Sequence, residues 1–84
     1  MPIYFLHIRH SDSVDEDLEG ASFDTLDEAT SNAAGALREL VAQNLRAARQ
    51  IDIYGIEITD PTGAVVASVS VEDAVLRELY QKDR

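Results

Sequence analysis

Two histidines and an aspartate near the start of the chain have side chains that can bind a metal ion. His7, His10 and Asp12 form the pattern His-x-x-His-x-Asp. A spacing of three places two histidines on one face of a helix, but the neighbouring residues predict a strand, in which positions 7 and 10 point to opposite faces. We therefore expect no metal site and no cofactor, and we interpret both histidines as ordinary strand and loop residues.

The acidic segment from Asp15 to Gly20 matches the opening of a calcium-binding loop. Acidic side chains occupy its first, third and fifth positions, and glycine occupies the sixth. Such a loop also needs a preceding helix and a bidentate carboxylate at its twelfth position, which here is Leu26. An acidic surface loop is the better interpretation. Whether residues 12–28 bind cations weakly stays open.

No group of residues in the chain predicts catalysis. A catalytic nucleophile needs a base and an orienting group beside it, and none of the serines lies in an elbow or a glycine-framed turn. Cysteine is absent, which excludes thiol catalysis, disulfides and cysteine-bound zinc. Four scattered glycines do not form a phosphate-binding loop. We predict that the protein is not an enzyme.

The charge of the chain restricts its partners. Sixteen acidic and seven basic residues give a net charge of −9, and half of the acids lie within residues 12–28. A field of this sign repels phosphate backbones, so we expect no direct binding of nucleic acid. The charge either keeps a small protein soluble or favours a basic protein partner.

The elements that position these residues form one predicted α+β domain, residues 1–84. Residues 3–9 predict a strand whose apolar face meets a helix, and residues 21–23 predict a short extra strand. Thr25-Leu-Asp-Glu28 is a capping box that begins a long helix running to about residue 50. Residues 72–82 predict a short C-terminal helix. Apolar runs are too short to span a bilayer, so we expect a cytoplasmic protein that does not enter a membrane.

Residues 53–71 predict a β-hairpin around the turn Asp60-Pro-Thr-Gly63. Its register has two solutions. Pairing 58 with 65 and 56 with 67 aligns the two apolar sets. A three-residue loop with a glycine bulge instead pairs 60 with 64, and thus 58 with 66 and 56 with 68.

The side of the sheet that faces away from the long helix is the candidate partner-binding face. Phe5, His7 and Arg9 share one face of the first strand, and Ile53 and Glu57 of the hairpin would join them. An aromatic, a histidine and an arginine on one face suit a protein contact. The alternative is that the terminal helix or a loop covers this face.

The ordered combination of several segments resembles a known family. It consists of Tyr4-Phe-Leu-His-Ile-Arg9, Asp17-Leu-Glu-Gly20, Thr25-Leu-Asp-Glu-Ala29 and Ile56-Glu-Ile-Thr-Asp60 with Gly63 and Val65-Val66. It is similar to a family of short proteins of unknown function, common in rhizobia and related α-proteobacteria. This resemblance implies a compact α+β domain and no established activity.

A narrower resemblance links the helix start at Thr25 to Ala29 to HicB-type antitoxins. It implies an acidic domain that covers a basic toxin. Residues 72–84 are too few for the DNA-binding segment that such antitoxins usually add. We predict a small acidic interaction or regulatory module that self-associates as a dimer. An antitoxin-like inhibitor of a basic protein is the alternative.

Overall fold

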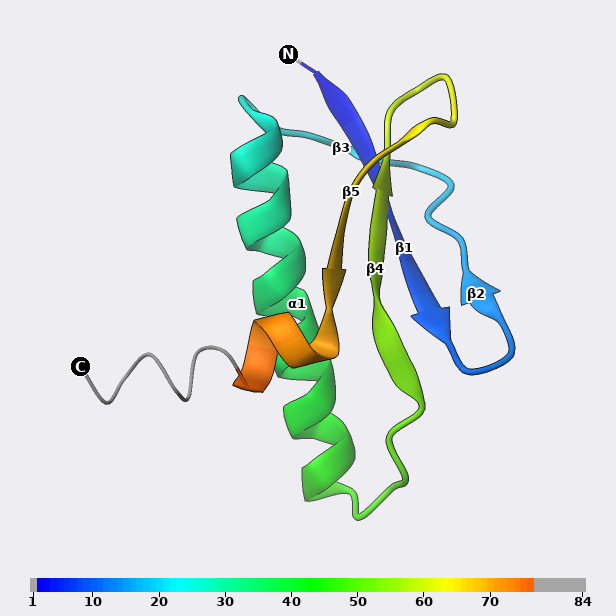
Figure 1. The fold of residues 1–84 in the computed structure, drawn as a ribbon, viewed down its shortest axis with the longest axis vertical. Helices are drawn as coiled ribbons and strands as arrows, with labels where there is room; N and C mark the ends of the chain where they lie inside the picture. Colours follow the sequence, from blue (N-terminus) through cyan, green and yellow to red (C-terminus); the bar gives the residue numbers. More distant parts are fainter. Residues whose placement is uncertain (1, 77–84) are drawn as a thin grey trace, which may run out of the picture.

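The computed structural model describes residues 2–76 and confirms the predicted fold class (Figure 1). An open antiparallel sheet and one long helix form its two layers. The elements in chain order are β1 (Ile3–His10), β2 (Val14–Asp15), β3 (Ala21–Ser22), α1 (Leu26–Arg46), β4 (Ile53–Thr59), β5 (Val65–Ser70) and the short helix η1 (Glu72–Leu76). In this part of the chain, neither helix has the length and apolarity that a bilayer crossing requires.

The sheet has the strand order β2-β1-β4-β5, and all of its strand pairs are antiparallel. The predicted extra strand before the helix is present as β3, which pairs with the beginning of β1. β2 pairs with the end of β1 along the same edge. The sequence did not predict β2, because only two residues within an acidic loop form it.

The core lies between α1 and the apolar face of the sheet. Leu6 pairs with Ile58 and Ile8 pairs with Ile56 on this face, as the alternation in β1 predicts. Leu37 of α1 and Ile58 of β4 are the largest side chains that are fully buried. α1 packs against β4, β5 and η1, and in Figure 1 it lies toward the β5 side of the sheet, away from β2.

The helix α1 begins as its capping box predicts. The Thr25 hydroxyl accepts a hydrogen bond of 3.1 Å from the Glu28 N–H. The helix ends at Arg46, about one turn before the predicted end, because Ala48 adopts the left-handed backbone conformation with φ 56°. Leu45 in the last turn is 66% exposed, so further helical turns would have found no core to pack against.

The hairpin between β4 and β5 has the predicted three-residue loop at its turn, but beyond the turn it follows neither of the two registers that the sequence left open. The Asp60 N–H donates to the Ala64 carbonyl over 3.0 Å, and Gly63 has φ 89°, so the turn is the three-residue loop. Beyond it, Thr59 pairs with Val65 but Ile58 pairs with Ala67, because Val66 forms a one-residue bulge. Because of the bulge, the apolar side chains of β5 beyond the turn point to the core. Burial of these side chains, and not the turn, therefore determines the register of the rest of the hairpin.

The predicted C-terminal helix, residues 72–82, lies only partly within the described residues. Glu72–Leu76 form one wide helical turn, and the Ser70 hydroxyl accepts a hydrogen bond of 3.0 Å from the Asp73 N–H at its start. Arg38 of α1 donates to the Ala74 carbonyl over 3.3 Å, which fixes this turn against the long helix. The remainder of the predicted helix, residues 77–82, lies outside the described residues.

Candidate functional site

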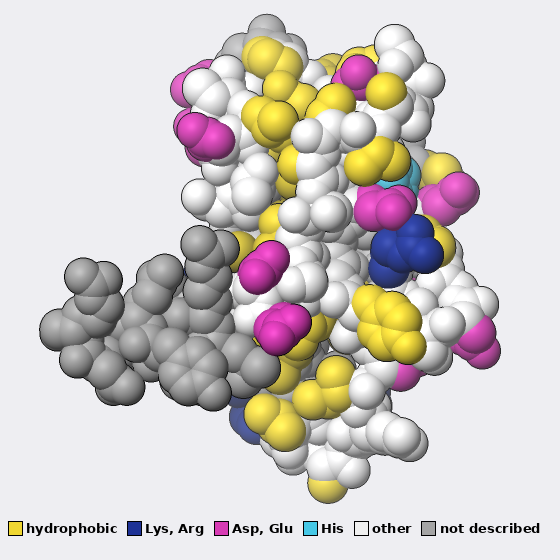
Figure 2. Space-filling view, viewed as in Figure 1, with side chains coloured by type: hydrophobic (Ala, Val, Ile, Leu, Met, Phe, Trp, Pro, Cys, Tyr) yellow, Lys and Arg dark blue, Asp and Glu magenta, His cyan; other side chains and the backbone are white. Residues whose placement is uncertain are grey.

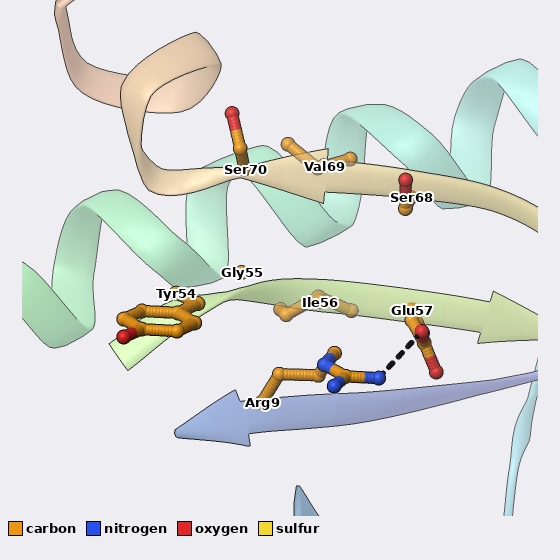
Figure 3. Close-up of a pocket in the computed structure, with 8 residues that line it drawn as sticks. All are labelled: Arg9, Tyr54, Gly55, Ile56, Glu57, Ser68, Val69 and Ser70. Atoms are coloured by element: carbon orange, nitrogen blue, oxygen red, sulfur yellow. Dashed lines mark hydrogen bonds and ion pairs between the residues drawn. The ribbon is translucent and has the colours of Figure 1, made fainter. Parts of the chain in front are cut away.

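A shallow pocket lies on the face of the sheet that is turned away from α1 (Figure 3). Its volume is about 180 Å³, and it spans the three neighbouring strands β1, β4 and β5. Figure 2 looks onto this face and shows a basic side chain close to acidic and large apolar ones. The pocket is lined by Arg9, Tyr54, Gly55, Ile56, Glu57, Ser68, Val69 and Ser70.

The only charged residues that line this pocket form an ion pair. Arg9 Nη1 lies 2.8 Å from Glu57 Oε2, and their side chains are 47% and 32% exposed. A pair at this exposure contributes little to folding. It does make the pocket locally neutral within a strongly acidic protein, so that a partner of either charge, or of none, can approach it.

Tyr54 stands on this face because β4 contains a second bulge. Arg9 pairs with Gly55 while His10 pairs with Ile53, which leaves Tyr54 without a partner on β1. A bulge re-aims the side chains beside it. Tyr54 is accordingly 61% exposed, whereas Ile53 is 8% exposed and belongs to the core. The prediction that placed Ile53 on the open face was therefore wrong.

Gly55 allows the strands on either side of the pocket to come together. A Cβ atom at this position would lie 2.3 Å from the Val69 carbonyl oxygen and 3.0 Å from the Ser70 Cα atom. Both contacts are with backbone, which cannot rotate away as a side chain can. A glycine is therefore required where β4 passes β5 next to the bulge.

His7 is held by two hydrogen bonds that determine where its proton lies. The Asp17 N–H donates to Nδ1 over 3.1 Å, so this nitrogen is the acceptor. Nε2 consequently carries the proton and donates to the Thr59 hydroxyl, 3.0 Å away. A general base acting on Thr59 would need the opposite tautomer. His7 therefore positions Thr59 and does not activate it.

Asp17 connects the acidic loop to β1 through its carboxylate. Oδ2 accepts from the Leu6 N–H over 3.1 Å, and Oδ1 accepts from the Gly20 N–H over 3.0 Å and from the Glu19 N–H over 3.2 Å. Burial opposes ionisation here, but these hydrogen bonds outweigh it and lower the pKa of Asp17. The segment that resembles a calcium loop thus uses a central carboxylate to bind its own backbone.

His10 lies between two carboxylates, one from β2 and one from the segment between α1 and β4. Its Nε2 is 2.9 Å from Asp15 Oδ2, and its Nδ1 is 3.3 Å from Asp52 Oδ1. Both nitrogens can donate at once only when the ring is protonated. The hydrogen bonds to Asp15 and then to Asp52 raise the pKa of His10. This triad joins β2 to the segment between α1 and β4.

The predicted partner-binding residues are divided between a covered and an open region. Phe5 and His7 stack with ring centroids 6.5 Å apart, and Gly20 of the acidic loop approaches the Phe5 ring so closely that a Cβ atom would lie 2.9 Å from it. Arg9 and Glu57 lie in the open pocket. The acidic loop therefore covers this face at the beginning of β1, and the face is open at the end of β1.

Six of the eight residues that line the pocket were missing from the predicted set, among them Tyr54, Ser68 and Ser70. Period-two alternation assigned Tyr54 to the core, and Ser68 and Ser70 were treated only as residues of the hairpin. A signal for Tyr54 does exist in the sequence. An isolated glycine within a strand, here Gly55, often marks a bulge, and a bulge reverses the face of the residue that it displaces.

Comparison with known proteins identifies the family of this chain. The model of a domain of unknown function, DUF6894, matches residues 3–72. The chain belongs to the DUF6894 family. The open pocket and all of the buried core except Ala74 lie within the matched DUF6894 segment, and the match agrees with the expectation of an uncharacterised family. No curated protein and no solved structure matches the chain.

Proposed function

We propose that this DUF6894 protein is a non-enzymatic interaction or regulatory module that self-associates as a dimer. The observation that carries the proposal is the open pocket, in which a bulge turns Tyr54 outward beside Arg9. Tyrosine and arginine are enriched at protein interfaces and among the residues that dominate binding. A second copy is the commonest partner of a soluble protein.

Charge supports a second copy as the occupant of this side. The pocket is locally neutral, since Arg9 pairs with Glu57. The adjoining residues 61–71 form the longest uncharged segment of the chain. Two copies of an acidic protein repel each other least where neither carries excess charge, and this side of the sheet meets that condition.

The hydrogen bonds of the two histidines support the non-enzymatic part of the proposal. His7 holds its proton on the nitrogen that faces Thr59, so it offers no free base to that hydroxyl. Both nitrogens of His10 face carboxylates. Nucleophilic catalysis needs a nucleophile beside an available base, and neither histidine supplies that arrangement.

Sedimentation across a range of protein concentrations tests self-association. We expect a monomer–dimer equilibrium between about 1 µM and about 1 mM, the range typical of small interfaces. Tyr54→Ser should weaken the dimer, whereas Leu18→Ser should not, although Leu18 is 83% exposed on the acidic loop. A wild-type protein that stays monomeric over the whole range would contradict the proposal.

An antitoxin-like inhibitor of a basic protein is the second candidate. It is favoured by the five acids within residues 12–19, the loop that contains β2, which stands at the opposite end of the strand order from the uncharged β5. Affinity purification from the native host at low salt should then recover a basic protein that about 0.5 M salt releases, because exposed charges are screened at that ionic strength. Recovery of no basic protein would count against this candidate.

A further inference from the structure

We infer that the second copy binds along β5, so that two antiparallel β5 strands join the sheets of both copies into one. This inference rests on the proposed self-association and names its interface. Among residues 2–76, β5 pairs with β4 alone and stands at the end of the strand order. An unpaired edge presents backbone donors and acceptors that another strand can satisfy.

The sequence of β5 lacks most of the features that normally prevent such pairing. Protective edge strands carry charged residues or proline, or they are very short. β5 has six residues, Val65–Ser70, with neither a charge nor a proline among them. Its one irregularity, the bulge at Val66, lies next to the turn and leaves residues 67–70 regularly paired. Val65 is 59% exposed and Val66 is 38% exposed.

The helices border this edge without pairing with it. α1 packs on β4 and β5, and η1 contacts both α1 and β5. A strand from a second copy would lie beside them along β5 and gain backbone hydrogen bonds.

Side-chain alternation limits how the two strands can align. In an antiparallel pair, residues that lie directly opposite each other point to the same face of the sheet. The two-fold axis that relates two β5 strands must therefore pass beside a residue, either Ser68 or Ala67. With the axis at Ser68, Val69 of each copy lies opposite Ala67 of the other. The same alignment brings Val66 of one copy next to Ser70 of the other, at the border of the Tyr54 pocket.

Lysine substitution on the edge tests this interface. Ser68 is exposed and lies opposite Glu57, so Ser68→Lys gains a partner within its own chain and should fold normally. Two lysines would meet at the axis, and we expect the dimer dissociation constant to rise at least about tenfold. Ser31→Lys, on the exposed surface of α1, makes the same change in net charge and should leave the constant unaltered.

Cross-linking provides a second measurement, which is clean because the chain has no cysteine. Directly opposed strand residues have Cα atoms about 4.5–5.5 Å apart, within the range that a disulfide spans. Ser68→Cys should form a covalent dimer under mild oxidation, and Ser31→Cys should not. A wild-type dimer that Ser68→Lys leaves intact and Ser68→Cys does not capture would overturn a β5 interface with its axis at Ser68 while self-association stands. A monomeric wild type would overturn both.

Discussion

The two edges of the sheet are built in opposite ways. Along the β1 edge, β2 and β3 pair with the two ends of the strand, and Asp17 accepts the Leu6 N–H between them. Along the β5 edge, no described segment pairs with the strand. One edge is thus closed by an acidic loop of the same chain, whereas at the other edge β5 pairs with β4 alone among residues 2–76.

Under the proposed self-association, this difference separates the residues that determine folding from those that determine association. The closed edge combines hydrogen bonds to Asp17 and His7 with most of the local negative charge. The open edge strand β5 is uncharged, and its residues Val65, Val66 and Ser68 are exposed. Substitutions at the closed edge should therefore change the free energy of unfolding, and substitutions at the open edge should change dimerisation.

The largest expected effect is on the stability of the fold, and it comes from a substitution that would separate β5, the open edge strand, from β4. Gly55→Ala places a methyl group against the Val69 carbonyl oxygen, and we expect it to destabilise the fold by about 3 kcal/mol. Urea denaturation measures the loss. Gly35→Ala is the matched control, since its Cβ atom would meet only Arg38 Nη2 at 3.8 Å. It should stabilise the helix by about 1 kcal/mol.

A smaller loss is expected when the closed edge is opened. Asp17→Ala leaves the N–H groups of Leu6, Glu19 and Gly20 without their acceptor and should cost about 2 kcal/mol. Because the pKa of Asp17 is lowered, its contribution is present above the ordinary value of 3.8 and is lost as pH falls through the folded value. Asp12→Ala, on the same exposed loop, should have almost no effect. Equal losses from both variants would refute the role assigned to Asp17.

The His10 triad should make the closed edge sensitive to pH. The pKa of His10 is raised above 6.5 by Asp15 and Asp52, so its stabilisation is complete below 6.5 and is lost as pH rises through the folded value. Wild type and His10→Gln should therefore differ more in urea midpoint at about pH 5.5 than at about pH 9. A difference that does not change with pH would show that the triad contributes no charge-dependent stability.

The smallest expected effect on folding belongs to the open edge. Ser68→Lys should change the free energy of unfolding of the monomer by less than about 0.5 kcal/mol, because the side chain is exposed and Glu57 lies opposite it. Denaturation at a concentration well below the dimer dissociation constant measures this. A loss comparable to that of Asp17→Ala would mean that β5 contributes to folding as much as the closed edge does.

Sequence patterns predicted the elements of this fold well, since local chemistry determines them. Thr25 and Glu28 placed the helix start, and Asp60 with Gly63 placed the turn. The patterns failed where one residue had to leave the alternation, at Tyr54 and at Val66. Both bulges depend on contacts with strands that are distant in sequence or on burial in the final core. For this reason Ile53 was assigned to the wrong face and the pocket residue Tyr54 was missed.

The central position of β1 has a consequence for synthesis of the protein. β1 pairs with β4, and the contact between His7 and Thr59 joins residues 52 positions apart. On the ribosome the first strand is therefore complete long before its main partner emerges, whereas β2 and β3 follow it closely. The acidic loop can pair with β1 during that interval and shield a strand that would otherwise aggregate. A segment that closes an edge in the finished molecule would thus act first as a temporary partner for the nascent chain.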